Sequence, residues 1–200
     1  MIIILVVGAS GAGKDTLISR ARTRLSGRRN FHFARRYVTR PPDDHEHNFF
    51  VDRQGFEILR SHGFFVADWQ AHNHCYGIPY AEIPCTVDPS AVTILSISRQ
   101  VAANLEKMFP AVVTVNITAQ PEILKQRLIG RGREHLSDIE KRLTRTPLLQ
   151  TRNLINFDNS GTLAATSADF ISLLENISLS ASMGTKVEHP VIPPFCQSAS

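Results

Sequence analysis

The sequence lacks several features that mark other classes of protein. Its 200 residues include only 3 cysteines, which are too widely spaced for a disulfide framework or a zinc site: Cys75, Cys85 and Cys196. No apolar run approaches the ~18 residues that a membrane-spanning helix needs, and the apolar start of the chain has no basic leader. We therefore expect no signal peptide, no membrane partner and a cytoplasmic location.

Lysine is also scarce, because 17 of the 22 basic residues are arginines. Arginine binds phosphate through two hydrogen bonds at once, so this bias suits a substrate with several phosphates, although genome composition explains it equally well. The basic residues are scattered and the aromatic residues do not alternate with them, which argues against a nucleic-acid surface. We expect a small-molecule partner and no nucleic acid, and the sequence leaves a monomer and a homodimer both open.

A glycine-rich segment follows directly after an apolar run at the start of the chain. Residues 2–7 are rich in β-branched side chains, which is typical of a strand buried on both faces of a parallel sheet. The next residues match the G-x-x-x-x-G-K pattern of a phosphate-binding loop (P-loop): Gly8, Ala9, Ser10, Gly11, Ala12, Gly13 and Lys14. The N–H groups of such a loop bind phosphate oxygens, and Lys14 would reach the β- and γ-phosphates of a nucleotide.

The residue after Lys14 departs from this pattern. The pattern has Ser or Thr there, whose hydroxyl binds Mg²⁺, whereas this chain has Asp15 followed by Thr16. A carboxylate is a hard oxygen ligand, so Asp15 could hold Mg²⁺ directly or through water. Alternatively, Asp15 only favours the start of the helix, and Thr16 faces the metal or packs. We include both residues in the predicted nucleotide site.

Strand and helix patterns alternate along the rest of the chain. We expect further strands at residues 31–38, 92–97, 112–117 and 153–159, and two short ones at 64–69 and 75–78. Helices are expected at 14–25, at 52–63 and at 163–177, and two more are expected to end at about 109 and to begin at 121. The apolar face of the helix at 52–63 would consist of Phe56, Ile58 and Leu59. The alternation predicts an α/β domain over residues 1–178. Residues 179–200 are polar and contain three prolines, so we expect a loosely ordered tail there.

Two groups of polar residues are candidates for binding an acceptor substrate. The block RRYVTRPP at 35–42 is typical of an anion clamp or of a solvated turn, and its candidates are Arg36, Thr39 and Arg40. Ser98 and Arg99 follow the strand at 92–97, at the edge where ligands bind in open α/β sheets. Arg99 is therefore a candidate phosphate contact, unless it only begins a helix. Tyr76 could contact a substrate or simply pack in the core.

Further arginines surround two glycines in the last third of the chain. Arg127, Arg131 and Arg133 lie around Gly130 and Gly132. Arg142 and Arg145 follow in an expected helix that begins with a capping box at 137–140. In a protein that uses nucleotides, this pattern is typical of a mobile lid that closes arginines over a phosphate in transfer. The alternative is a pair of exposed basic helices.

These motifs together resemble those of the guanylate kinases and their relatives. GASGAGKD, RRYVTRPP, the C-Y-G and RGREHLSDIEKRL occur in the order found in that family, over residues 2–178. The resemblance implies ATP and Mg²⁺ as cofactors and a P-loop kinase fold, with a parallel five-stranded sheet flanked by helices. It also implies a small acceptor-binding insert at about 36–85 and an arginine-rich lid at about 130–146. The catalytic residues would be Lys14, Arg131, Arg133 and Arg142.

The chain departs from guanylate kinases where those enzymes bind guanine. They have a glutamate before the Tyr-Gly and a Ser or Thr after it, whereas here residues 67–69 are Ala-Asp-Trp and Ile78 follows Gly77. They also carry an Asp-x-Asp at the end of a core strand, where this chain has Ser-Ile-Ser-Arg at 96–99. The combination of G-K-D, S-R and R-G-R-E is similar to that of the ribose 1,5-bisphosphate phosphokinases of bacterial phosphonate breakdown.

This resemblance implies a specific reaction. The γ-phosphoryl group of ATP would pass to the 1-phosphate of ribose 1,5-bisphosphate, giving 5-phosphoribosyl 1-diphosphate (PRPP) and ADP. A phosphate acceptor is already ionised, so catalysis needs no general base and reduces to alignment and charge neutralisation. Two alternatives stay open, a guanylate or other nucleoside monophosphate kinase and a non-catalytic binding module of the same fold.

Overall fold

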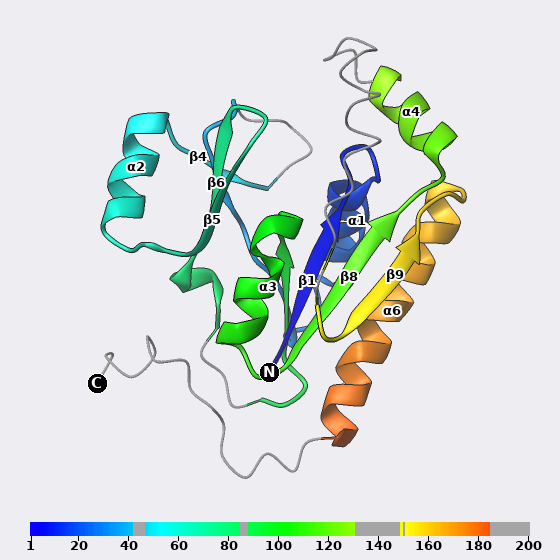
Figure 1. Cartoon of the computed structure of the whole chain (residues 1–200). Coiled ribbons are helices and arrows are strands. Elements are labelled where there is room, and N and C mark those ends of the chain that lie inside the picture. Colours follow the sequence, from blue (N-terminus) through cyan, green and yellow to red (C-terminus); the bar gives the residue numbers. More distant parts are fainter. Residues whose placement is uncertain (42–46, 85–87, 131–148, 150, 185–200) are drawn as a thin grey trace.

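A five-stranded parallel sheet forms the centre of the molecule (Figure 1). The computed structural model describes residues 1–41, 47–84, 88–130, 149 and 151–184. In the order of the sheet, the strands are β2 (Phe31–Phe33), β7 (Val92–Ser96), β1 (Ile2–Gly8), β8 (Val112–Thr118) and β9 (Leu154–Asp158). The predicted parallel five-stranded sheet is confirmed, and the strand that precedes the glycine-rich loop lies in the middle of it.

Helices cover both faces of this sheet, because its central strands are apolar on both sides. One face packs against α1 (Lys14–Leu25) and α6 (Leu163–Gly184), whose buried residues include Leu17, Ile18, Phe170 and Leu174. The other face packs against α3 (Arg99–Met108) through Ala102 and Leu105. A further helix of the central unit is α4 (Pro121–Gly130), and its Leu128 lies against the glycine-rich loop. Among the helices that the structure describes, none is long and apolar enough to span a bilayer.

A second, four-stranded sheet lies beside the central one. Its strands are, in order, β4 (Phe49–Phe50), β3 (Tyr37–Val38), β6 (His74–Pro79) and β5 (Phe65–Ala71). A two-residue turn joins β5 to β6, and its residues His72 and Asn73 have positive φ angles of 53° and 63°, as a tight hairpin turn requires. A short helix, α2 (Arg53–Ser61), covers the outer face, and a 3₁₀ turn, η1 (Tyr80–Glu82), leads back to the central sheet.

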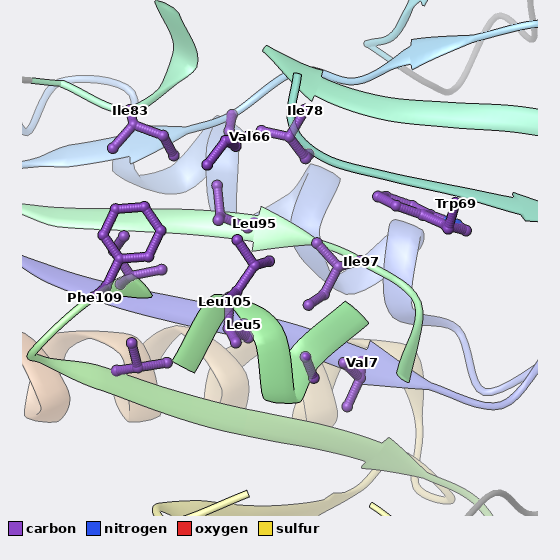
Figure 2. Close-up of a cluster of buried hydrophobic side chains, with 14 of the residues drawn as sticks. Leu5, Val7, Val66, Trp69, Ile78, Ile83, Leu95, Ile97, Leu105 and Phe109 are labelled. Atoms are coloured by element: carbon purple, nitrogen blue, oxygen red, sulfur yellow. The ribbon is translucent and has the colours of Figure 1, made fainter. Parts of the chain in front are cut away.

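One apolar cluster joins the two sheets. Figure 2 shows Leu5, Leu95 and Leu105 of the central unit facing Val66 and Ile78 of the second sheet. Ile78 and Leu5 have no exposed surface. Because the same side chains fill the space between both units, the second sheet is held in a defined position beside the carboxyl ends of the central strands.

Three expectations on secondary structure are wrong. Residues 31–38 form two strands in different sheets, because Ala34 still bonds to Ile94 of β7 while the N–H of Arg35 donates to Glu82, where the chain leaves the central sheet. Ile58 is 54% exposed, because it lies two residues from the buried Phe56 and therefore points to the opposite side of α2. The last helix continues to Gly184, so residues 179–184 are helical rather than part of a tail. The rest of the expected tail, 185–200, lies outside the described residues.

Candidate functional site

The glycine-rich loop connects the carboxyl end of β1 to the first turn of α1. Gly11 and Gly13 both have φ values of 84°, in the left-handed region that glycine adopts without strain. Gly13 is the N-cap of α1, and it has no side chain that could accept hydrogen bonds from the first turn. The N–H groups at this helix start are therefore suited to the oxygens of an anionic ligand.

Two side chains from elements distant in sequence form hydrogen bonds that support the glycine-rich loop. Asn159 follows β9, is 2% exposed, and donates from Nδ2 to the Ala12 carbonyl at 2.7 Å. Arg127 of α4 donates to the carbonyls of Ala12 and Asn159 at 3.4 and 2.9 Å. A Cβ on Gly13 would collide with the Asn159 amide, so the loop needs glycine here for packing as well as for its backbone conformation. The sequence pattern indicated neither contact, and it placed Asn159 only at the end of the last expected strand.

Four charged and polar side chains meet beside the loop. Ser96, the last residue of β7, has its hydroxyl at the centre of the group. Lys14 Nζ donates to Ser96 Oγ at 2.7 Å, and Arg36 Nη1 donates to the same oxygen at 3.1 Å. The Ser96 hydroxyl in turn lies 3.1 Å from Asp15 Oδ1. The predicted residues Lys14, Asp15 and Arg36 are thus brought together, and Ser96 is a member that sequence reasoning missed.

The carboxylate of this group is surrounded by positive charge. Asp15 Oδ1 lies 3.0 Å from Lys14 Nζ and 3.3 Å from Arg36 Nη2. Partial burial acts to raise the pKa of Asp15, but the charges of Lys14 and Arg36 and the hydrogen bonds from Lys14 and Ser96 outweigh it. The pKa of Asp15 is therefore held well below its usual range, and the carboxylate stays ionised throughout the neutral range.

Arg36 also connects the group to the second sheet. It lies directly before β3, and its Nε donates to Asn48 Oδ1 at 3.2 Å, while its guanidinium carbon lies 5.9 Å from the centre of the Tyr76 ring. A cavity of about 30 Å³ adjoins the group, and it is lined by Asp15, Ile18, Ser19, Arg22, Ala34, Arg36, His47, Asn48, Ile94 and Ser96. Arg36 itself is 8% exposed, so its charge is directed into this region rather than into bulk solvent.

The predicted residues Ser98 and Arg99 have different surroundings. Ser98 is the N-cap of α3 and accepts a hydrogen bond from the N–H of Gln100. Arg99 Nη2 donates to Asn116 Oδ1 of β8 at 3.1 Å, and Asn116 Nδ2 donates to Asn156 Oδ1 of β9 at 2.9 Å. Burial lowers the pKa of Arg99. Its Nε is buried and has no hydrogen-bond partner among the described residues.

The remaining predicted residues are partly engaged in the fold. The Tyr76 ring is 9% exposed and stacks on Trp69, with ring centres 5.5 Å apart, so Tyr76 packs in the core. Thr39 accepts a hydrogen bond at its hydroxyl from the Cys75 N–H at 2.8 Å. Arg40 is half-buried and Thr16 is exposed. The predicted lid residues Arg131, Arg133 and Arg142 lie outside the described residues.

The oxygen donors beside the loop fit a Mg²⁺ ion. Among the described residues there is no group of three or more His, Cys, Asp or Glu side chains that could form a metal cage. Mg²⁺ does not need such a cage beside a nucleotide, because it keeps several waters and takes one or two carboxylates together with phosphate oxygens. Asp15 supplies a carboxylate whose side chain is 42% exposed, and Ser96 supplies a hydroxyl next to it.

The fold and this site define the class of protein. A glycine-rich loop between the middle strand of a parallel sheet and the following helix, with a lysine at the helix start, is the arrangement of the P-loop nucleotide-binding proteins. The guanylate kinase family model matches residues 1–159. The chain therefore belongs to the guanylate kinase family, as its motifs predicted.

Individual relatives agree with this assignment. The chain is 37% identical to a ribose 1,5-bisphosphate phosphokinase PhnN of Rhizobium etli, over 88% of this chain and 90% of that protein. It is 38% identical to the protein of the same name from Agrobacterium fabrum, over 86% and 95%. Among solved structures, a guanylate kinase from Anaplasma phagocytophilum superimposes with a TM-score of 0.65 at 20% identity, covering 92% of this chain and 87% of that one. That structural likeness shows the shared fold.

Proposed function

We propose that this protein is an ATP-dependent phosphotransferase that phosphorylates the 1-phosphate of ribose 1,5-bisphosphate and gives PRPP and ADP. The relatives that carry this activity in their name match nearly the whole chain. The observation on which the proposal rests is that two cationic side chains donate hydrogen bonds to the same hydroxyl oxygen. Lys14 comes from the glycine-rich loop and Arg36 from the edge of the second sheet, yet both donate to Ser96 Oγ. In this proposal each of the two elements binds the phosphates of one substrate, and their convergence at one point suits a transfer from phosphate to phosphate.

Each residue has a role in this proposal. The loop N–H groups and Lys14 bind the β- and γ-phosphates, while Arg36, Arg40 and Arg99 bind the phosphates of the acceptor. Asp15 holds Mg²⁺, which supplies further positive charge when it is bound. The acceptor phosphate is already ionised, so no side chain has to remove a proton, and these residues align the two groups and neutralise their charge.

The lid remains part of the proposal through its sequence pattern alone. We assign Arg131, Arg133 and Arg142 the role of closing over the transferring phosphoryl group, because arginines aimed at developing charge are the usual means of stabilising it. Thr39, Tyr76 and Ser98 stay proposed contacts of the acceptor. Their observed bonds and ring contacts with the protein fix the positions from which they would reach it.

The geometry around residues 67–69 argues against guanylate as the acceptor. Ala67 and Trp69 of β5 pack against the apolar cluster between the sheets. Because successive side chains of a strand point to opposite faces, Asp68 points away from that cluster, and it is exposed. Ile78 is completely buried in the same cluster. Neither of the positions that replace the guanine-binding residues therefore presents a polar group toward the space beside the loop.

A direct comparison of acceptors tests the proposal. The kcat/KM would be measured for ribose 1,5-bisphosphate and for GMP under identical concentrations of ATP and Mg²⁺. We expect ribose 1,5-bisphosphate to be the preferred acceptor. A value for GMP that equals or exceeds it would identify a guanylate kinase, and binding of ATP without turnover of any acceptor would identify a non-catalytic module.

A further inference from the structure

Compared with other P-loop enzymes, this chain has a carboxylate and a hydroxyl in each other's places, one at the loop and one at the end of the neighbouring strand. In P-loop nucleotide-binding enzymes, Mg²⁺ is held by a Ser or Thr hydroxyl from the loop and by a carboxylate from the end of a strand. Here the loop carries the carboxylate of Asp15, and the strand end carries the hydroxyl of Ser96. β7 is the direct neighbour of β1, and Ser96 lies opposite Val6, two residues before the loop begins.

The two exchanged groups are in contact. Ser96 Oγ lies 3.1 Å from Asp15 Oδ1, although the residues are 81 positions apart in the sequence. We propose that Asp15 and Ser96 form one Mg²⁺ site in which the carboxylate comes from the loop and the hydroxyl from the strand. This inference rests on the proposed function, because it assumes that a nucleotide triphosphate occupies the loop.

The surroundings of the pair suit a hydrated metal ion. Ser96 is 6% exposed, whereas the Asp15 side chain is 42% exposed, so the hydroxyl forms the inner wall of the site and the carboxylate its open edge. Both line the cavity of about 30 Å³, which exceeds the roughly 10–15 Å³ that a cavity needs to hold a water molecule. Mg²⁺ retains several waters when a protein binds it, so one carboxylate, one hydroxyl and the nucleotide phosphates form a sufficient ligand set.

The cations beside Asp15 set a condition for metal binding. Lys14 and Arg36 both lie within 3.3 Å of the same Oδ1, so Mg²⁺ can approach this oxygen only when these cations turn to other anions. The phosphates of the nucleotide and of the acceptor are such anions. We therefore expect the metal to bind together with the nucleotide, and to bind weakly on its own. The competing explanation is that Asp15 only fixes Lys14 and Arg36 by ion pairing.

An exchange of the two residues separates these explanations. The variants are Asp15→Ser, Ser96→Asp and the double variant that carries both changes. Calorimetry would measure the affinity of a non-hydrolysable ATP analogue in Mg²⁺ and in EDTA, and the ratio of the two affinities is the gain due to metal. Electron paramagnetic resonance would count Mn²⁺ bound in the presence of the analogue. No acceptor is present, so the outcome does not depend on which acceptor the enzyme uses.

The proposal makes distinct predictions for these variants. Asp15→Ser should reduce the gain due to metal by at least ~10-fold, the scale on which loss of a metal-site partner acts. The double variant should recover most of that gain and its bound Mn²⁺, because it restores the usual arrangement of hydroxyl and carboxylate. A gain that is unchanged in Asp15→Ser, or no better in the double variant than in Asp15→Ser, would overturn the proposal.

Two further variants keep the test decisive if the double variant does not fold. Asp15→Asn keeps the shape of the side chain and Ser96→Ala removes only the hydroxyl, and each should reduce the gain due to metal. An unchanged gain in either would count against the shared site. Asp169→Ser is the matched control, because Asp169 is an exposed carboxylate on α6, and it should behave like the wild-type protein.

Discussion

The two faces of the central sheet differ in chemistry where the strands end. On the α1 face, Lys14, Asp15 and Arg36 surround the hydroxyl of Ser96, so cations and a carboxylate share one small region. On the α3 face, Arg99 bonds to the amide of Asn116, which bonds to the amide of Asn156. The first face balances opposite charges, and the second combines one cation with neutral amides.

This difference predicts different ligands for the two faces. A carboxylate near two cations can exchange those partners for a metal ion when phosphates arrive, so the α1 face suits a nucleotide with its metal. Arginine beside neutral amides has no carboxylate to compete for its hydrogen bonds, so the α3 face suits an anion directly. In the proposed reaction the acceptor has two phosphates, and we expect each face to bind one of them, through Arg36 and Arg99.

The largest effect should follow from removing Lys14. Lys14→Ala should lower kcat by ~10²–10³-fold, because an electrostatic group aimed at charge that develops in the reaction is commonly worth that much. Steady-state kinetics with ribose 1,5-bisphosphate would measure the effect. Lys107→Ala, which alters an exposed lysine on α3, is the control. A folded Lys14→Ala protein with wild-type kcat would refute the role of the loop.

Replacing the two arginines tests whether the faces have different roles. Arg36→Met and Arg99→Met should each raise the KM for ribose 1,5-bisphosphate by ~10–100-fold, because a hydrogen bond to a charged group contributes about 1.5–3 kcal/mol. Only Arg36→Met should also change the affinity for ATP with Mg²⁺, because Arg36 forms an ion pair with Asp15 and Arg99 bonds to Asn116 instead. Equal effects of both variants on nucleotide affinity would show that the faces act as one site.

Removing the Asn159 side chain that supports the glycine-rich loop should affect the stability of the fold more than the rate of the reaction. Asn159→Ala removes a buried donor to the Ala12 carbonyl, so we expect the free energy of unfolding to fall by about 1–3 kcal/mol. The KM for ATP should rise as well, because the loop loses the hydrogen bond that holds its Ala12 carbonyl. Urea unfolding would measure the first effect, with the exposed Asn104→Ala as the control. An unchanged unfolding midpoint would show that Arg127 alone holds the loop.

The smallest effect concerns the pH dependence of stability. Lys14 and Arg36 lower the pKa of folded Asp15 below its unfolded value of about 3.9. The stabilisation is therefore complete above that unfolded value and is lost as pH falls further, toward the folded pKa. Asp15 is partly exposed, so we expect at most about 1 kcal/mol. Urea unfolding of Asp15→Asn should show a deficit at pH 7 that shrinks toward pH 3, and a deficit that grows in acid would contradict the shift.

The strand, loop and helix at the start of the chain could be predicted from the sequence because they depend on neighbouring residues. Six apolar residues, glycines at fixed spacing and a lysine specify residues 2–25 without reference to any other part of the chain. The apolar runs of β7 and β8 likewise predicted buried strands. The resemblance of the motifs predicted the family and the five-stranded sheet, and both are confirmed.

The partners of the site residues depend on which strands lie side by side, and an apolar pattern is the same whichever neighbour a strand has. Only the placing of β7 beside β1 brings Ser96 to Asp15, across 81 residues of sequence. Only the placing of β9 at the sheet edge brings Asn159 to Ala12, across 147 residues. The sequence alone determined the residue types that could bind phosphate, and the packing of distant segments decided which of them share a site.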